Sequence, residues 1–183
     1  MEKLLKTERL LLRKFKYDDW LDLYDYLSQE EVVKYEPYDI MSEEQCKKEA
    51  INRSKNNVFW AVCLKGNNKL IGNIYFNQIE PKDFMTWELG YVFNPKYQRK
   101  GYATEACQKI LDYGFKTLGV HRITAKCNPD NIPSWKLLER LSMRREGHFK
   151  KCAFFKRTAK GEPIWHDAYQ YSILKDEWLL KVK

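Results

Sequence analysis

The feature that most constrains the fold of this chain is a change of hydrophobic period between residues 85 and 118. Over Met85–Phe93 every second residue is large and apolar, which is the period of a strand with one packed face. From Ala103 to Leu118 apolar residues recur at spacings of three and four, the period of one helical face. Gly119 then ends the predicted helix. A strand that leads directly into a long amphipathic helix predicts a layered α/β (α+β) fold.

The same reasoning predicts the other elements of the fold. Further strands are expected over Leu10–Phe15, Phe59–Leu64, Leu70–Asn77, Arg122–Cys127, Phe149–Phe155 and Ala168–Leu174, and further helices over 18–28, 42–55 and 131–141. Asp18 is the expected cap of the first helix, and Ser42 with Gln45 has capping-box spacing at the start of the second. Together about seven strands predict one strongly twisted mixed sheet with helices on both faces.

The bulk composition narrows the possible classes of protein. A chain of 183 residues fits one domain over residues 1–183. The net charge of +8 favours an anionic partner such as nucleic acid, a membrane surface or a phosphorylated cofactor, although spread charge also serves solubility. Five cysteines without metal or redox spacing fit a reduced cytoplasmic compartment. No apolar run approaches the ~20 residues that span a bilayer, so no membrane partner is expected.

The turn between the predicted strand and helix, residues 94–105, is the first candidate site. It is basic, and Gly101 and Ala103 leave little side-chain bulk at the helix start, so a phosphate can approach the free backbone N–H groups. The alternative is an ordinary tight connection, and spacing alone does not decide between them. The Walker pattern and the dinucleotide pattern G-x-G-x-x-G are both absent from the sequence, which excludes those two phosphate sites.

The run Gln98–Ala103 matches the [QR]-x-x-G-x-[GA] signature, and the chain therefore resembles the GCN5-related N-acetyltransferase (GNAT) superfamily. Its ribosomal-protein-alanine N-acetyltransferase branch is similar over nearly the whole chain. The similar segments are Thr7–Arg13, Leu70–Ile74, Trp87–Tyr91, Asn128–Ser134, Arg144–Gly147 and Tyr171–Leu174. One departure is Ser142, where the branch has glycine, and this puts a left-handed helix end there in doubt.

The resemblance implies where acetyl-CoA, the acetyl donor, binds. The strands Met85–Phe93 and Arg122–Cys127 are expected to splay apart and admit it. The residues expected to bind it are Tyr91, Val92 and Phe93 on the strand, Gln98, Arg99, Lys100, Gly101, Tyr102, Ala103 and Thr104 in the turn, and Asn131 in the second motif. A backbone N–H near Val92 would polarise the thioester carbonyl. The resemblance implies no metal.

Two residues are expected to carry the chemistry. Glu88 is the candidate base, acting through water, because only a neutral amine is nucleophilic and the acceptor must lose a proton. The alternative is a half-exposed carboxylate in an ion pair. Ser134 is the candidate proton donor to the leaving thiolate, and the alternatives are a helix cap or a contact with sulfur. Tyr35, Glu36 and Tyr38 are expected near the acceptor, because the resemblance places that region at the acceptor cleft.

The histidines and the two cysteines Cys107 and Cys127 are expected to have structural roles. His121, His148 and His166 have no metal spacing, and Cys107 and Cys127 fall in core-like patterns rather than at a nucleophile position.

The sequence thus predicts an N-acetyltransferase in which an amine attacks acetyl-CoA directly within a ternary complex. The acceptor is either a protein N-terminal α-amine or a small amine, and the fold alone cannot choose. A basic RNA- or ribosome-binding module without catalysis and a degenerate acyl-CoA sensor are the alternatives. No DNA partner is expected, and the protein is expected to be a monomer or homodimer.

Overall fold

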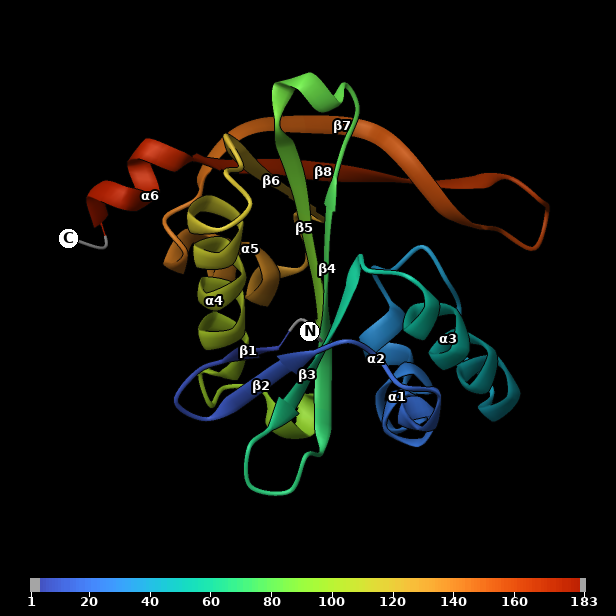
Figure 1. Cartoon of the computed structure of the whole chain (residues 1–183). Helices are drawn as coiled ribbons and strands as arrows, with labels where there is room; N and C mark the ends of the chain where they lie inside the picture. Colours follow the sequence, from blue (N-terminus) through green and yellow to red (C-terminus); the bar gives the residue numbers. More distant parts are fainter. Residues whose placement is uncertain (1–3, 182–183) are drawn as a thin grey trace.

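The computed structural model of the protein describes residues 4–181, and its core is one eight-stranded sheet (Figure 1). The strands are β1 (Leu5–Lys6), β2 (Leu10–Arg13), β3 (Phe59–Leu64), β4 (Leu70–Gln78), β5 (Thr86–Phe93), β6 (Arg122–Cys127), β7 (Arg144–Arg157) and β8 (Pro163–Leu174). Their order is β1-β2-β3-β4-β5-β6-β8-β7. All neighbours are antiparallel except β5 and β6, which run parallel, so the sheet is mixed, as predicted.

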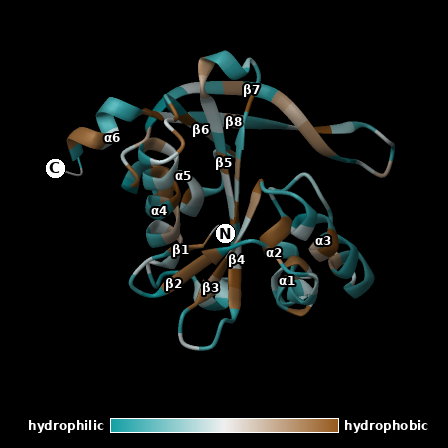
Figure 2. Cartoon of the chain, viewed as in Figure 1, coloured by the Kyte–Doolittle hydropathy of each residue, from teal (hydrophilic) through white to brown (hydrophobic). Residues whose placement is uncertain are grey.

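Helices cover both faces of this sheet. They are α1 (Trp20–Leu27), α2 (Glu30–Val33), α3 (Glu43–Lys55), α4 (Tyr102–Lys116), α5 (Ile132–Arg140) and α6 (Lys175–Lys181), with 3-10 turns at Tyr17–Asp19, Lys82–Phe84 and Pro95–Tyr97. One buried apolar cluster joins the sheet to α4, α5 and α6, and a second joins it to α1 and α3. Figure 2 shows hydrophobic colour in strands β2 and β3, whose buried side chains belong to these clusters.

Most of the predicted elements are confirmed, and the misses are short or lie at ends. β1 and α2 have two and four residues, too few for a hydrophobic period to be visible. The closing hairpin is longer than predicted, because β7 begins at Arg144 and β8 at Pro163. It extends as an arm beyond the body of the sheet (Figure 1). Among residues 4–181 the structure contains no helix that is both long and apolar enough to cross a bilayer.

The predicted caps have mixed outcomes. The box at α3 is confirmed: Ser42 Oγ accepts from the Gln45 N–H at 3.3 Å, and Gln45 Oε1 accepts from the Ser42 N–H at 2.8 Å. Asp18 as the cap of the first helix is wrong, because Asp18 lies inside the 3-10 turn and Asp19 precedes α1. The Asp19 carboxylate does not cap the helix either. It accepts two bonds from the Arg13 guanidinium, at 2.8 and 2.7 Å, a tertiary contact that local sequence does not reveal.

The doubt over Ser142 is resolved in favour of a left-handed helix end. Ser142 has φ of 62°, and the Met143 N–H donates to the Leu138 carbonyl at 3.0 Å, the closing bond of a Schellman turn. The buried side chains of Leu141 and Met143 hold the chain on either side, so packing offsets the steric cost of a non-glycine residue there.

The predicted splay of the central strands is present. β5 pairs with β6 only through Thr86, Trp87 and Glu88, opposite Arg122, Ile123 and Thr124. β4 continues to pair with β5 as far as Phe93. The edge of β5 that faces β6 is therefore open from Leu89 onward, and this opening creates the candidate site.

Candidate active site

A cleft of about 1480 Å³ lies where β5 and β6 stop pairing. Most of its lining comes from four segments: residues 88–93 of β5, the turn and start of α4 between 95 and 108, the loop and start of α5 between 126 and 137, and residues 31–38 in and after α2. Single residues of other elements complete the wall, among them Arg9, Arg53, Phe59, Asn73, Tyr75, Arg140 and Phe155. The volume exceeds the ~300–1,000 Å³ of ordinary small-molecule sites, so a long ligand and a second molecule can share it.

The turn before α4 presents backbone N–H groups to this cleft. Gly101 caps α4 with φ of 81°, and the Glu105 N–H makes the first helical bond, to the Gly101 carbonyl at 3.0 Å. The N–H groups of Tyr102, Ala103 and Thr104 precede that bond and point out of the helix start. A Cβ at Gly101 would lie 3.3 Å from Arg9 Nη2 and would occupy the approach to them. The turn therefore fits a phosphate.

Arg9 is a residue of this turn that sequence reasoning missed. Its Nη1 donates to the Lys100 carbonyl at 3.0 Å, its guanidinium pairs with Glu105 at 2.7 Å, and it lies 4.6 Å from the Tyr102 ring centre. Glu105 also accepts from the Thr7 hydroxyl and the Arg9 N–H. These contacts lower the pKa of Glu105, against the effect of burial, which is the largest single influence and raises it. The segment before β2 thus braces the α4 start, and the Arg9 charge is paired with that of Glu105.

The other basic residues of the turn differ in their placement. Arg99 lines the cleft, whereas Lys100 does not, because its Nζ turns back to the Lys96 carbonyl at 3.2 Å. Gln98 lines the cleft, and its amide donates to the Phe93 carbonyl at 3.4 Å. Arg140 at the end of α5 also lines the cleft, with its Nε 3.4 Å from Thr104 Oγ1. Arg140 is 36 positions from Thr104 in the sequence, and no local pattern indicates this contact.

The predicted strand residues Tyr91, Val92 and Phe93 all line the cleft. They pair with Ile74, Asn73 and Gly72 of β4 on one side. Their other edge is the open one, so an extended ligand arm can pair there as an added strand.

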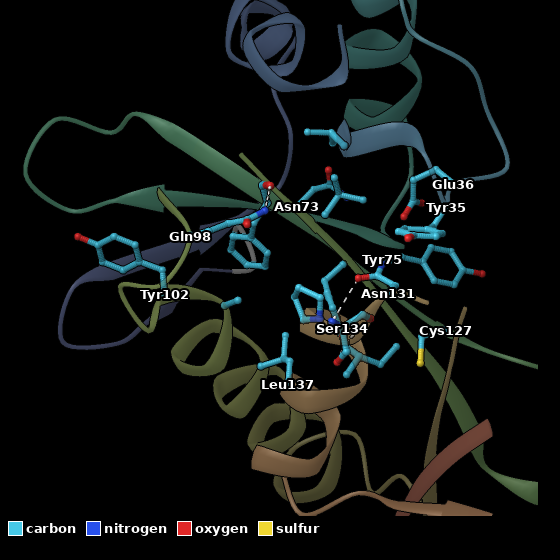
Figure 3. Close-up of a pocket in the computed structure, with 18 of the residues that line it drawn as sticks. Tyr35, Glu36, Asn73, Tyr75, Gln98, Tyr102, Cys127, Asn131, Ser134 and Leu137 are labelled. Carbon is cyan, nitrogen blue, oxygen red and sulfur yellow. Dashed lines mark hydrogen bonds between the residues drawn. The ribbon is translucent and has the colours of Figure 1, made fainter. Parts of the chain in front are cut away.

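Asn131 and Ser134 lie at the start of α5, where a helix cap was one of the alternatives left open for Ser134. Asn131 caps the helix, because its Oδ1 accepts from the Ser134 N–H at 3.3 Å (Figure 3). The alternative that Ser134 is the cap is therefore wrong. Ser134 Oγ lies 3.0 Å from the Tyr91 hydroxyl, which also donates to the Ser134 carbonyl at 2.9 Å. Tyr91 thus holds the Ser134 hydroxyl at the wall of the cleft.

Glu88 stands at the fork of the two strands. It is the last β5 residue that pairs with β6, its side chain is half-buried, and it lines the cleft. Leu89 and Phe93 belong to the apolar cluster under α4, and Val92 belongs to the opposite cluster, so alternation places Glu88 on the Val92 face. Glu88 therefore lies on the face of β5 opposite to Leu89 and Phe93.

The wall formed by residues 31–38 carries a second carboxylate. Figure 3 shows Glu36 and Tyr35 on this wall, across the cleft from Asn131 and Ser134. Burial raises the pKa of Glu36 to about 7, against the opposing influence of the Tyr38 hydroxyl and the Arg53 charge. The Tyr35 hydroxyl donates to the Asp130 carbonyl at 3.3 Å and so joins the two walls. A carboxyl that titrates near neutral pH is a functional candidate. The sequence predicted the position of Glu36 in this region but not its raised pKa.

The cysteines and histidines do not form a competing site. Burial raises the pKa of Cys127 to about 11 and that of the buried Cys107 further, so neither thiol is a ready nucleophile. His148 pairs with Asp167, and His166 contacts Asn128. In the part of the chain that the structure describes, no three His, Cys, Asp or Glu side chains are grouped as metal ligands.

An open strand edge beside a helix start with free N–H groups, and a carboxylate at the fork, is an arrangement that fits an acyltransferase with a phosphorylated donor. Comparison with known proteins agrees. The family model of the acetyltransferase (GNAT) domain matches residues 9–144, and the chain belongs to this family.

The relatives are N-acetyltransferases. The chain is 45% identical to the N-acetyltransferase YnaD of Bacillus subtilis over 176 residues, 95% of this chain and 98% of YnaD. It is 30% identical to the ribosomal protein uS5-alanine N-acetyltransferase of Escherichia coli over 156 residues, 80% of each chain. The crystal structure of a GNAT-family acetyltransferase from Bacillus anthracis superposes with a TM-score of 0.87 at 42% identity, over 96% of this chain and all of that one.

These matches confirm the predicted family and its relation to the ribosomal-protein branch. The protein is therefore an acyltransferase, and the relatives do not support a purely RNA-binding module or a sensor without turnover.

Proposed function

We propose that the protein transfers an acetyl group from acetyl-CoA to a primary amine that attacks the thioester directly. The observation that carries this proposal is the meeting of three features in one cleft: the open edge of β5, the exposed N–H groups of α4, and Glu88 at the fork.

The chain's own groups fit the donor. Acetyl-CoA supplies the activated acetyl thioester. The N–H groups of Tyr102, Ala103 and Thr104, with Arg9 and Arg99 beside them, bind its diphosphate. The open edge of Tyr91, Val92 and Phe93 pairs with its arm, and the N–H groups near Val92 stabilise charge on the carbonyl oxygen.

Two carboxylates act on the acceptor amine, one by binding it and one by accepting its proton. Glu36 binds the acceptor ammonium, because it is half-buried on the acceptor wall and ionises near neutral pH. Glu88 accepts the proton through water before attack, since it lies at the fork next to the open edge. Because one carboxylate binds the amine and the other accepts its proton, removal of Glu36 is expected to raise KM mainly and removal of Glu88 to lower kcat mainly.

Ser134 is the proposed donor to the leaving thiolate. The Tyr91 hydroxyl fixes its position through bonds to the Ser134 carbonyl and hydroxyl, at 2.9 and 3.0 Å. A thiol pKa near 8.5 makes this donation helpful rather than essential, so loss of Ser134 is expected to slow rather than stop turnover.

The proposed acceptor is a protein N-terminal α-amine. The Escherichia coli relative at 30% identity is named as an alanine N-acetyltransferase of ribosomal protein uS5, and this name supports a protein acceptor. A spermidine N-acetyltransferase from Vibrio cholerae, solved with CoA and spermine, shares the fold at a TM-score of 0.77 but only 21% identity, over 94% of this chain and 99% of that one. An α-amine with a pKa of about 7.7–8.0 also needs less help from a base than an alkyl amine.

The test is a thiol-release assay with acetyl-CoA against peptides with free N-termini, polyamines and aminoglycosides. The proposal expects turnover with at least one peptide and higher kcat/KM for peptides than for spermidine. Absence of turnover with every amine, together with no heat of CoA binding, would refute it.

A further inference from the structure

Arg53 is a buried cation at the acceptor end of the cleft that the proposed chemistry does not use. It lies in the last turn of α3, it is 2% exposed, and it lines the cleft. Its guanidinium lies 4.4 Å from the Phe59 ring centre and 5.4 Å from that of Phe15. These aromatic contacts fix the planar group in place.

The hydrogen bonds of Arg53 are incomplete. Its Nε donates to Glu49 Oε1 at 2.7 Å. Its Nη1 is buried, and within residues 4–181 it has no hydrogen-bond partner. A buried donor without an acceptor is costly, and a charged one more so, which points to an acceptor atom that a ligand brings.

Besides Glu49, which accepts from Nε, the Arg53 charge also acts on the carboxylate of Glu36. Burial raises the pKa of Glu36 to about 7, so near neutral pH it is only partly ionised. Glu36 therefore does not provide a permanent anion for Nη1, and its own position on the wall suits an ammonium group.

Sheet register gives the scale of the separation between Phe59, whose ring Arg53 contacts, and the open edge of β5. Phe59, under Arg53, pairs with Tyr75 on β4, and Tyr75 pairs with Gly90 on β5. Two strand spacings of about 4.8 Å place Phe59 about 10 Å from the open edge of β5. An extended peptide advances about 3.3–3.6 Å per residue, so this separation corresponds to about three residues.

We propose that Arg53 binds a carboxylate on the acceptor, and that the preferred acceptors are peptide N-termini with an aspartate or glutamate at the second or third residue. This inference rests on the proposed function and specifies its substrate. Polyamines carry no carboxylate and gain nothing from Arg53.

The test uses pairs of C-terminally amidated peptides that differ only by Glu or Gln at one of these positions. The wild-type protein is expected to favour the Glu peptide in kcat/KM by about tenfold or more, the usual worth of a hydrogen bond to a charged group. Arg53→Met should reduce this ratio to near one, and Arg53→Lys should retain part of it. Lys55→Met, at an exposed cation of the same helix, should leave the ratio unchanged.

Because the ratio is measured within each variant, loss of folded protein does not alter it, and CoA calorimetry reports folding independently. Equal kcat/KM for the Glu and Gln peptides at both positions in the wild type would overturn the inference even if Arg53 variants do not fold. An unchanged ratio in Arg53→Met would also overturn it. If no peptide is acetylated, calorimetry of the same pairs with CoA present decides: equal affinity refutes the Arg53 site, and the lack of peptide turnover separately refutes the N-terminal acceptor of the proposed function.

Discussion

The two ends of the cleft are built in different ways. The end that fits the cofactor is mainly one continuous run, residues 91–104, which contributes backbone groups. The end proposed for the acceptor combines side chains from several segments: α2 and the loop after it, α3, β3, β4 and the β7–β8 hairpin. They include Glu36, Arg53, Phe59, Tyr75 and Phe155. One end is a local structure and the other is a tertiary assembly.

This difference explains how substitutions in such a protein can change the acceptor that it recognises while its donor stays the same. A diphosphate is recognised by N–H groups that any sequence carries, provided that glycine leaves room for it. An acceptor is recognised by side chains, and each lies on a separate segment that can change alone. Four predictions test this division, in order of expected effect.

The largest effect is expected for Gly101→Glu. It places a carboxylate where the diphosphate should bind and should reduce CoA affinity by about 1,000-fold, since like charges in contact cost several kcal/mol. Isothermal titration with CoA measures this. Gly161→Glu is the matched control, because Gly161 has a similar φ of 82° but lies in the β7–β8 turn with open space around it. Equal loss of affinity in both variants would mean that backbone strain, not the phosphate site, is responsible.

Glu88→Gln should lower kcat by about 100-fold, the lower range for loss of a general base, and leave CoA affinity within a factor of two to three. Steady-state kinetics at saturating peptide measure it. Glu80→Gln serves as control, because Glu80 is an exposed carboxylate in the loop between β4 and β5. Full activity of Glu88→Gln at saturating substrate would show that another group takes the proton.

Glu36→Gln should raise the KM for the amine by about tenfold with a smaller effect on kcat, because it removes the partner of the acceptor ammonium. In the wild type, Glu36 becomes protonated as the pH falls through about 7, so KM should rise on the acid side. This acid-side rise should be absent in Glu36→Gln. A pH profile of KM that is the same in both proteins would contradict the role.

The smallest effect is expected on the free energy of unfolding, again for Glu36→Gln. Burial raises the pKa of Glu36 from 4.5 to about 7, so the folded protein holds this proton more tightly than the unfolded chain between those pH values. Its contribution to stability is therefore greatest below pH 4.5 and is lost as the pH rises through about 7. Glu36→Gln should increase the free energy of unfolding by about 1–3 kcal/mol at pH 8 and change it little at pH 4. Urea unfolding at the two pH values measures the difference, and equal shifts at both would exclude burial as the cause.

At the cofactor end, much of the placement could be predicted from sequence. The strand Met85–Phe93, the turn and the helix that follows each carry a periodic or compositional signal, and the structure confirms them as β5, the turn and α4. The exception is Lys100, which the pattern includes but the structure turns away from the cleft. The roles of these residues in binding remain proposals.

The sequence alone determined the family, the mixed sheet and the segment proposed to face the donor, because period, caps and a glycine turn act over a few neighbouring residues. The tertiary structure decided that Arg9 braces the α4 start, that Asn131 rather than Ser134 caps α5, and that Arg53 is buried without a full set of partners. Each of these depends on which distant segments pack together. Burial and pairing of a side chain are properties of that packing, and the order of residues along the chain does not state them.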